Sequence, residues 1–167
     1  MKKILMMVAL MAMTMTVSAQ SLDGNWQAEK KMGIAVLTFK LAFEGNQVTQ
    51  SLVGTADKEV GLITMSFAAP AQNYTPGKTI DFTLDASKVE AKIEDIKFND
   101  EVKAEIKDNP EMEKFIRQME DEDVEEKKEY TANQVMFNGK CTISNQTAES
   151  FELKNSNGDT YIFKKVK

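Results

Sequence analysis

The side chains best suited to chemistry are the carboxylates of the run EDEDVEE, residues 120–126. A pair of carboxylates could support glycosidase-type hydrolysis, and a converging set of carboxylate oxygens could bind calcium. On a helix, however, Asp121, Asp123 and either Glu125 or Glu126 do not converge, and no glycine turn folds them around an ion. We therefore predict that the run is the solvated end of a helix and forms neither a catalytic nor a metal site.

The rest of the composition argues against further classes of catalytic and binding site. The chain has no histidine and one cysteine, so the commonest general base and the usual nitrogen and sulfur ligands of metals are lacking. A serine or cysteine nucleophile would need an unusual base, and no glycine-rich phosphate-binding loop is present. The formal net charge is −5 and no basic stripe is visible, which argues against nucleic acid as a partner. We expect no enzymatic activity, no cofactor and no metal.

The single cysteine, Cys141, lies in an alternating segment in which Phe137 and Ile143 share its face. An exposed thiol would be a hazard in an oxidising compartment. We predict that Cys141 is a small buried core residue; the alternative is a reactive thiol.

The N-terminal stretch has the pattern of a secretory signal peptide. Residues 1–19 carry two lysines directly after Met1, continue as an apolar run and end in the small-residue pattern Val17-Ser18-Ala19. The run is shorter than the ~20 residues of a membrane-spanning helix, which argues against the alternative of a membrane anchor. We expect cleavage near Ala19 and export to the periplasm or beyond. The mature chain, residues 20–167, would then be soluble, form a single domain and contain no transmembrane segment.

Apolar and polar residues alternate along most of the mature chain, which is the pattern of half-buried β-strands. Between residues 34 and 43, for example, Leu37, Phe39 and Leu41 share one face. Hairpin turns are expected at residues 44–47 and 155–159, the second as a type I′ turn at Asn157-Gly158. Further strands are expected at 47–54, 58–69, 78–85, 87–98, 133–144, 150–155 and 159–166.

The period changes to that of a helix between residues 99 and 128. Asn109 and Pro110 suit the start of a helix, which we expect to run to about Glu126 after a shorter helix. An apolar stripe then repeats at helical spacing, through Met112, Phe115, Ile116 and Met119. The stripe must cover an apolar surface, either as a helix packed on the sheet or as a lid over a ligand cavity.

An exposed sheet edge is a liability that closure removes, so the strand pattern predicts an antiparallel up-and-down barrel. The fold class is therefore all-β, with an α-helical insertion between late strands. Trp26, the only tryptophan, stands two residues after Gly24 at the head of the first strand. This Gly-X-Trp triplet resembles the signature of lipocalins and the wider calycin barrels, and the C-terminal hairpin is similar to the ending of small secreted lipocalin-like domains of bacteria.

The resemblance implies that Trp26 plugs the closed end of the barrel and that Gly24 lets the chain pass close to it; the alternative is an ordinary core aromatic. Lipocalins place an arginine over this tryptophan, whereas the only arginine here is Arg117, in the expected helix. Lys164 or Lys165 would have to take that place. The helix also interrupts the strand order, so we expect a divergent calycin-like domain of the bacterial envelope.

These features favour a secreted binding module for a small apolar or amphipathic ligand, such as a lipid. Strand parity predicts an interior lined by Phe39, Phe43, Met65, Phe67, Phe82 and Phe137, with Met112, Phe115, Ile116 and Met119 gating it. The alternative is a solid-core module that binds an envelope protein through its acidic helix or its 68–77 loop, where Tyr74 would be an exposed anchor. The two hypotheses differ over whether a cavity exists.

Overall fold

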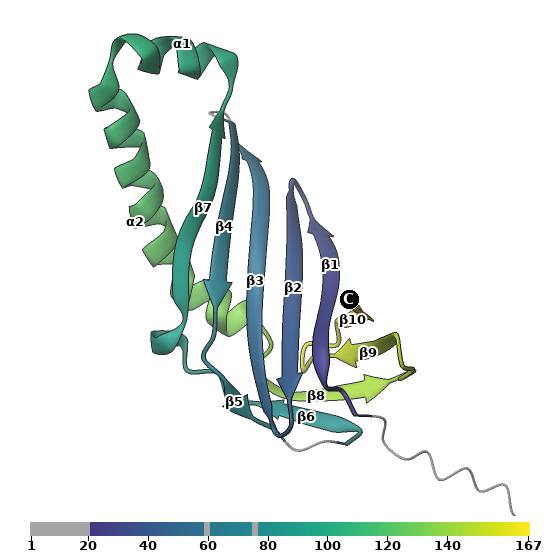
Figure 1. The fold of residues 1–167 in the computed structure, drawn as a ribbon. Helices are drawn as coiled ribbons and strands as arrows, with labels where there is room; N and C mark the ends of the chain where they lie inside the picture. Colours follow the sequence, from purple (N-terminus) through teal and green to yellow (C-terminus); the bar gives the residue numbers. More distant parts are fainter. Residues whose placement is uncertain (1–20, 59–60, 75–76) are drawn as a thin grey trace, which may run out of the picture.

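The computed structural model describes residues 21–58, 61–74 and 77–167, with side chains on part of the second helix left aside (Figure 1). Ten strands form one antiparallel sheet in the order β6-β8-β9-β10-β1-β2-β3-β4-β7, and β5 pairs with β3. The strands are β1 (Gly24–Met32), β2 (Ala35–Glu44), β3 (Gln47–Lys58), β4 (Gly61–Ala68), β5 (Gln72–Asn73), β6 (Thr79–Phe82), β7 (Glu90–Phe98), β8 (Gly139–Ser144), β9 (Ser150–Lys154) and β10 (Thr160–Lys165). The fold is mostly β, as the alternation predicted.

The sheet curls into a half-barrel (Figure 1). In the part of the chain that the structure describes, the strand path begins at β6 and ends at β7, so the sheet stays open where a closed barrel was expected. Helix α2 (Pro110–Gln134) lies against β7 and the short helix η1 (Ala86–Lys88). A β-bulge further bends β7, because Glu94 is the extra residue between the pairs Met65–Ile93 and Thr64–Asp95. A covering helix, a bulge and charged residues are common ways to protect a sheet edge.

The hairpin between β9 and β10 forms where it was predicted, but its turn type differs. Gly158 has a positive φ of 91°, whereas Asn157 is not among the described non-glycine residues with positive φ, so the turn is not type I′. The Gly158 N–H donates to the Asn155 carbonyl at 3.1 Å, and the Asp159 N–H donates to the Asn155 side chain at 2.9 Å. The Asn155 side chain thus supplies an acceptor that a two-residue turn would not need.

The helical insertion starts as predicted and ends later. Asn99 caps α1 (Asp100–Asp108), and its side chain accepts the Val102 N–H at 2.9 Å. Helix α2 begins at Pro110 but continues to Gln134, about two turns beyond its expected end. The expected strand at 133–144 is correspondingly shorter, since β8 begins at Gly139. Ala132 is buried at helical spacing from Val135, so packing favours the helix there.

Among the described residues, no helix combines the length and the apolar character that crossing a membrane requires.

Aromatic side chains pack together in the core on the concave face. Phe137 is central, with ring centroids 5.4 Å from Phe39, 5.8 Å from Phe82 and 4.9 Å from Tyr161. Phe151 stacks on Phe163 at 5.1 Å. Such pairs contribute to stability beyond their buried area.

A buried glutamine anchors the connector between α2 and β8. Gln50 on β3 donates to the Phe137 carbonyl at 2.8 Å and accepts the Phe137 N–H at 3.0 Å. Both backbone groups lie away from solvent, and the two bonds hold residues 135–138 across the concave face. Within the described chain the connector pairs with no strand at this point, and the glutamine side chain supplies the hydrogen bonds instead.

We expect Gln50→Leu to lower the free energy of unfolding by about 2–3 kcal/mol, because it leaves two buried backbone groups of Phe137 without partners. Urea unfolding followed by far-ultraviolet circular dichroism measures the change. Thr49→Leu, on the adjacent exposed position, is the matched control and should change stability by less than about 0.5 kcal/mol. An equal loss in both variants would contradict the role of the two hydrogen bonds.

Candidate functional site

The concave face also holds an apolar cavity of about 500 Å³. Its sheet wall follows from the strand register, which aligns inward residues of β2, β3 and β4 in rows. One row is Ala35, Ala56 and Ile63, and the next is Leu37, Gly54 and Met65. Alanine and glycine at the centre of these rows leave space that larger side chains would fill. The cavity is therefore a consequence of small inward residues on β3.

Helix α2 supplies the opposite wall. Lys127, Tyr130 and Thr131, from its last turns, line the cavity together with Val135 just beyond the helix. Tyr130 is 64% exposed and Met32, on β1, is 49% exposed, so these two residues stand at the mouth. The wall from the sheet is apolar, whereas the helix adds an ammonium and two hydroxyl groups. This arrangement suits an apolar or amphipathic molecule.

The connector that Gln50 anchors runs from the cavity wall to the aromatic core. Val135 lines the cavity, and Phe137, two residues later, is buried among the aromatic rings. Leu52 and Phe67 belong both to the buried core and to the cavity wall. The concave face thus combines a packed aromatic cluster with an apolar cavity.

The predicted ligand-lining residues fall into three groups. Met65 and Phe67 line the cavity. The rings of Phe39, Phe43, Phe82 and Phe137 are buried within the aromatic core and are not part of the cavity wall. The proposed gate, Met112, Phe115, Ile116 and Met119, lies on α2, but these side chains fall outside the described part of the structure, and the gate remains a prediction.

Sequence reasoning did not name much of the actual wall. Leu37, Leu52 and Ile63 line the cavity and have the inward parity that the alternation gives. Strand parity could therefore have placed these three residues among the predicted lining residues. Gly54 and Ala56 gave no apolar signal, and Tyr130 and Thr131 lay beyond the expected end of the helix.

The environment of Trp26 matches several expectations. Its side chain is 2% exposed, its ring meets Phe151 edge-on at 4.9 Å, and its Nε1–H donates to the Leu22 carbonyl at 2.5 Å. The Lys165 ammonium lies 5.2 Å from the ring centroid, which is the place expected for a lysine. Gly24 has a positive φ of 116°, and a Cβ there would come within 2.9 Å of the Lys165 side chain. Gly24 therefore lets Lys165 reach the tryptophan.

No protein-family model matches the chain, and no curated protein matches it either. The described residues hold no group of three or more cysteine, aspartate or glutamate side chains placed to bind a metal ion.

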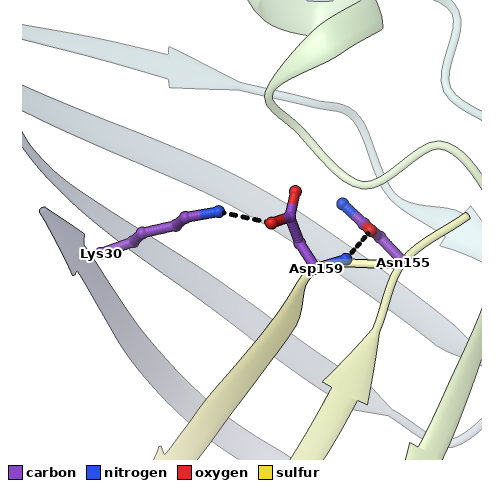
Figure 2. A network of polar contacts seen from close by, with 3 residues as sticks. All are labelled: Lys30, Asn155 and Asp159. Atoms are coloured by element: carbon purple, nitrogen blue, oxygen red, sulfur yellow. Dashed lines mark hydrogen bonds and ion pairs between the residues drawn. The ribbon is translucent and has the colours of Figure 1, made fainter. Parts of the chain in front are cut away.

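An ion pair bridges the seam between β1 and β10. Within the described chain, register pairs join these strands only at Trp26–Lys165 and Gln27–Lys164. Further along β1, Lys30 Nζ lies 3.0 Å from Asp159 Oδ1 at the β9–β10 turn (Figure 2) and 4.9 Å from the centroid of the Tyr161 ring. The hydrogen bond to Asp159 raises the pKa of Lys30 above its ordinary value. The pair therefore links the strands where backbone pairing ends.

Tyr74 does not form an exposed anchor on the 68–77 loop. It is buried, and its ring meets Phe43 edge-on at 5.0 Å. Burial also raises the pKa of its hydroxyl. The expectation of an exposed Tyr74 was wrong, because the short strand β5 folds this loop back onto the core beside β3.

Cys141 is buried, and burial raises the pKa of its thiol to about 11. The folded state therefore favours the neutral thiol, whereas an unfolded thiol ionises near pH 9. Its contribution to stability is complete below pH 9 and is lost as the pH rises toward 11.

We expect the wild type to lose about 1 kcal/mol more stability than Cys141→Ala between pH 8 and pH 10. Urea unfolding at the two pH values measures the difference, and the alanine variant cancels the titration of lysines and tyrosines. Folded protein should also resist a thiol reagent at pH 8. Equal pH dependence of the two proteins would show that the thiol ionises normally.

Proposed function

We propose that the chain is an exported binding module for a small apolar or amphipathic ligand, lipid-like in character, which it holds in the cavity between α2 and strands β2–β4. The observation that carries the proposal is the cavity of about 500 Å³, lined on the sheet side by aliphatic and aromatic residues. Ligand pockets of small molecules are commonly ~300–1,000 Å³ and mostly apolar. Burial of the ligand's apolar surface would supply the affinity.

The family assignment is part of the same proposal. We infer a divergent calycin-like domain, and the packing of Trp26 under Lys165 at the head of β1 supports it. Export rests on the pattern of residues 1–19, in which two lysines after Met1 are followed by an apolar run and by small residues up to Ala19.

Native mass spectrometry tests the proposal. Residues 20–167 would be purified gently from the envelope compartment and measured before and after solvent extraction. We expect an adduct in the mass range of lipids that extraction removes. A clean apo mass, together with no binding of anilinonaphthalene sulfonate, would refute ligand binding and favour a protein partner for the acidic part of α2.

A further inference from the structure

The hairpin between β1 and β2 ends in an exposed apolar tip. Ile34 is 70% exposed, Met32 is 49% exposed, and Gly33 lies between them. Val36, on the outer face of β2, is also exposed. Isolated exposed apolar residues are normal, but neighbours on one turn form a contact surface. We call Met32, Gly33, Ile34 and Val36 the apolar tip.

The apolar tip is continuous with the mouth of the cavity. Met32 and its register partner Ala35 both line the cavity, and Tyr130 stands across the mouth on α2. A ligand that enters or leaves through this mouth passes the tip. An apolar ligand is mostly found in lipid, so the tip is placed where such a ligand would be exchanged.

We propose that the apolar tip inserts shallowly into the surface of a phospholipid bilayer, where the cavity exchanges its ligand; this rests on the proposed function of the cavity. Aliphatic side chains can enter the acyl boundary without a shaped partner. Tyr130 is amphipathic and suits the headgroup level, and the exposed Lys31 can extend its ammonium to phosphates.

The backbone of the tip is already prepared for such an environment. The β1–β2 register continues up to Met32–Ala35, so the strands are paired as far as the two-residue turn. Backbone groups without partners are costly in lipid, and pairing up to the turn keeps that cost small. A second copy of the chain is a weaker candidate, because four residues fall far short of the ~800 Å² per partner of a stable interface.

Charge indicates which bilayer would bind. The formal net charge is −5, and Glu29 stands beside the lysines of β1, so an anionic surface would repel much of the molecule. We therefore expect binding to zwitterionic vesicles of phosphatidylethanolamine and phosphatidylcholine. Because apolar insertion drives it, added salt should weaken it little.

Vesicle flotation of residues 20–167 tests the proposal. We expect Ile34→Glu to lower the vesicle partition coefficient about tenfold, through loss of apolar burial and the cost of inserting a charge. Ile162→Glu is the matched control, since Ile162 is 59% exposed on the outer face of β10; it should change the coefficient less than about twofold. Equal binding of the wild type and Ile34→Glu, or no binding of the wild type, would overturn the proposal.

A site-specific probe gives an independent reading. Cys141 is buried, so a dye sensitive to polarity can be placed selectively on Ile34→Cys or on Ile162→Cys. Vesicles should shift the emission of the dye to the blue at position 34 only. A shift that depends on protein concentration without vesicles would instead indicate a second copy.

Ligand binding in the cavity and bilayer insertion of the apolar tip can be refuted separately. Ile34 is not among the residues that line the cavity, so Ile34→Glu should keep the adduct or the anilinonaphthalene sulfonate signal. Vesicle binding without any cavity ligand would refute the proposed function and the exchange role of the tip, while cavity ligand without vesicle binding would refute the tip alone.

Discussion

Replacing Trp26 with alanine should lower the free energy of unfolding by about 3–5 kcal/mol, the largest loss of stability that we expect from one substitution. The indole is almost fully buried and packs edge-on against Phe151. Its N–H also donates to the Leu22 carbonyl, and the Lys165 ammonium lies over the face of its ring. The variant removes these contacts together and leaves a void where β1 meets β10.

Graded variants separate the contributions. Trp26→Phe keeps much of the packing but loses the hydrogen bond to Leu22, so it should cost about 1–2 kcal/mol. Lys165→Met keeps the aliphatic stem and loses the cation, at about 0.5–1 kcal/mol. Urea unfolding followed by circular dichroism serves every variant, including those without tryptophan. A cost below about 1 kcal/mol for Trp26→Ala would show that Trp26 is not central to the core.

Strand alternation predicted much of this fold because, in a half-buried strand, apolar residues occupy every second position and so identify the buried face. The inward parity of Leu37, Phe39 and Leu41 matches their position on the concave face, and Phe82 and Cys141 are buried as expected. The openness of the sheet could not be predicted in the same way. Among the described residues, β6 and β7 meet no strand on their outer sides, and α2 packs against β7. These arrangements depend on contacts between distant segments.

The position of the cavity could not be predicted from strand parity either. Parity says which side chains point inward, but it does not say at which level of the half-barrel the interior is full. The filled level includes Phe137 in the connector between α2 and β8, which two hydrogen bonds with the Gln50 side chain anchor to β3. Phe39 and Met65 therefore have the same parity, yet Phe39 packs in the aromatic core and Met65 lines the cavity.

The residue at which α2 ends could not be predicted from the sequence for a related reason. Residues 133–144 alternate well enough to suggest one strand, and local alternation does not reveal that Ala132 and Thr131 are buried by tertiary packing. Tertiary context overrides such weak local preferences. The residues of α2 that line the cavity, among them Tyr130 and Lys127, could therefore be identified only from the structure.

Gly54→Phe should weaken ligand binding strongly while leaving the fold intact. Gly54 lies at the centre of the cavity wall, between its register partners Leu37 and Met65. A Cβ at this position would lie 3.3 Å from the end of the Leu37 side chain, which is a tight contact. Leu37 is flexible at that end, so a shift of a few tenths of an ångström would let the backbone accept a side chain that projects into the cavity. A phenyl ring would then occupy the space that the ligand needs.

Because overpacking a filled site costs about 1–3 kcal/mol, we expect affinity to fall by up to ~100-fold, measured by titration with anilinonaphthalene sulfonate and by loss of the native adduct. Stability should change by less than about 1 kcal/mol, since the ring fills existing space and a strand glycine is removed. Gly54→Leu adds less volume and keeps the test usable if the larger variant misfolds. Thr55→Phe, the adjacent residue on the outer face, is the matched control and should bind normally. Unchanged affinity in Gly54→Phe would place the ligand elsewhere, and an equal loss in Thr55→Phe would attribute the effect to the sheet as a whole.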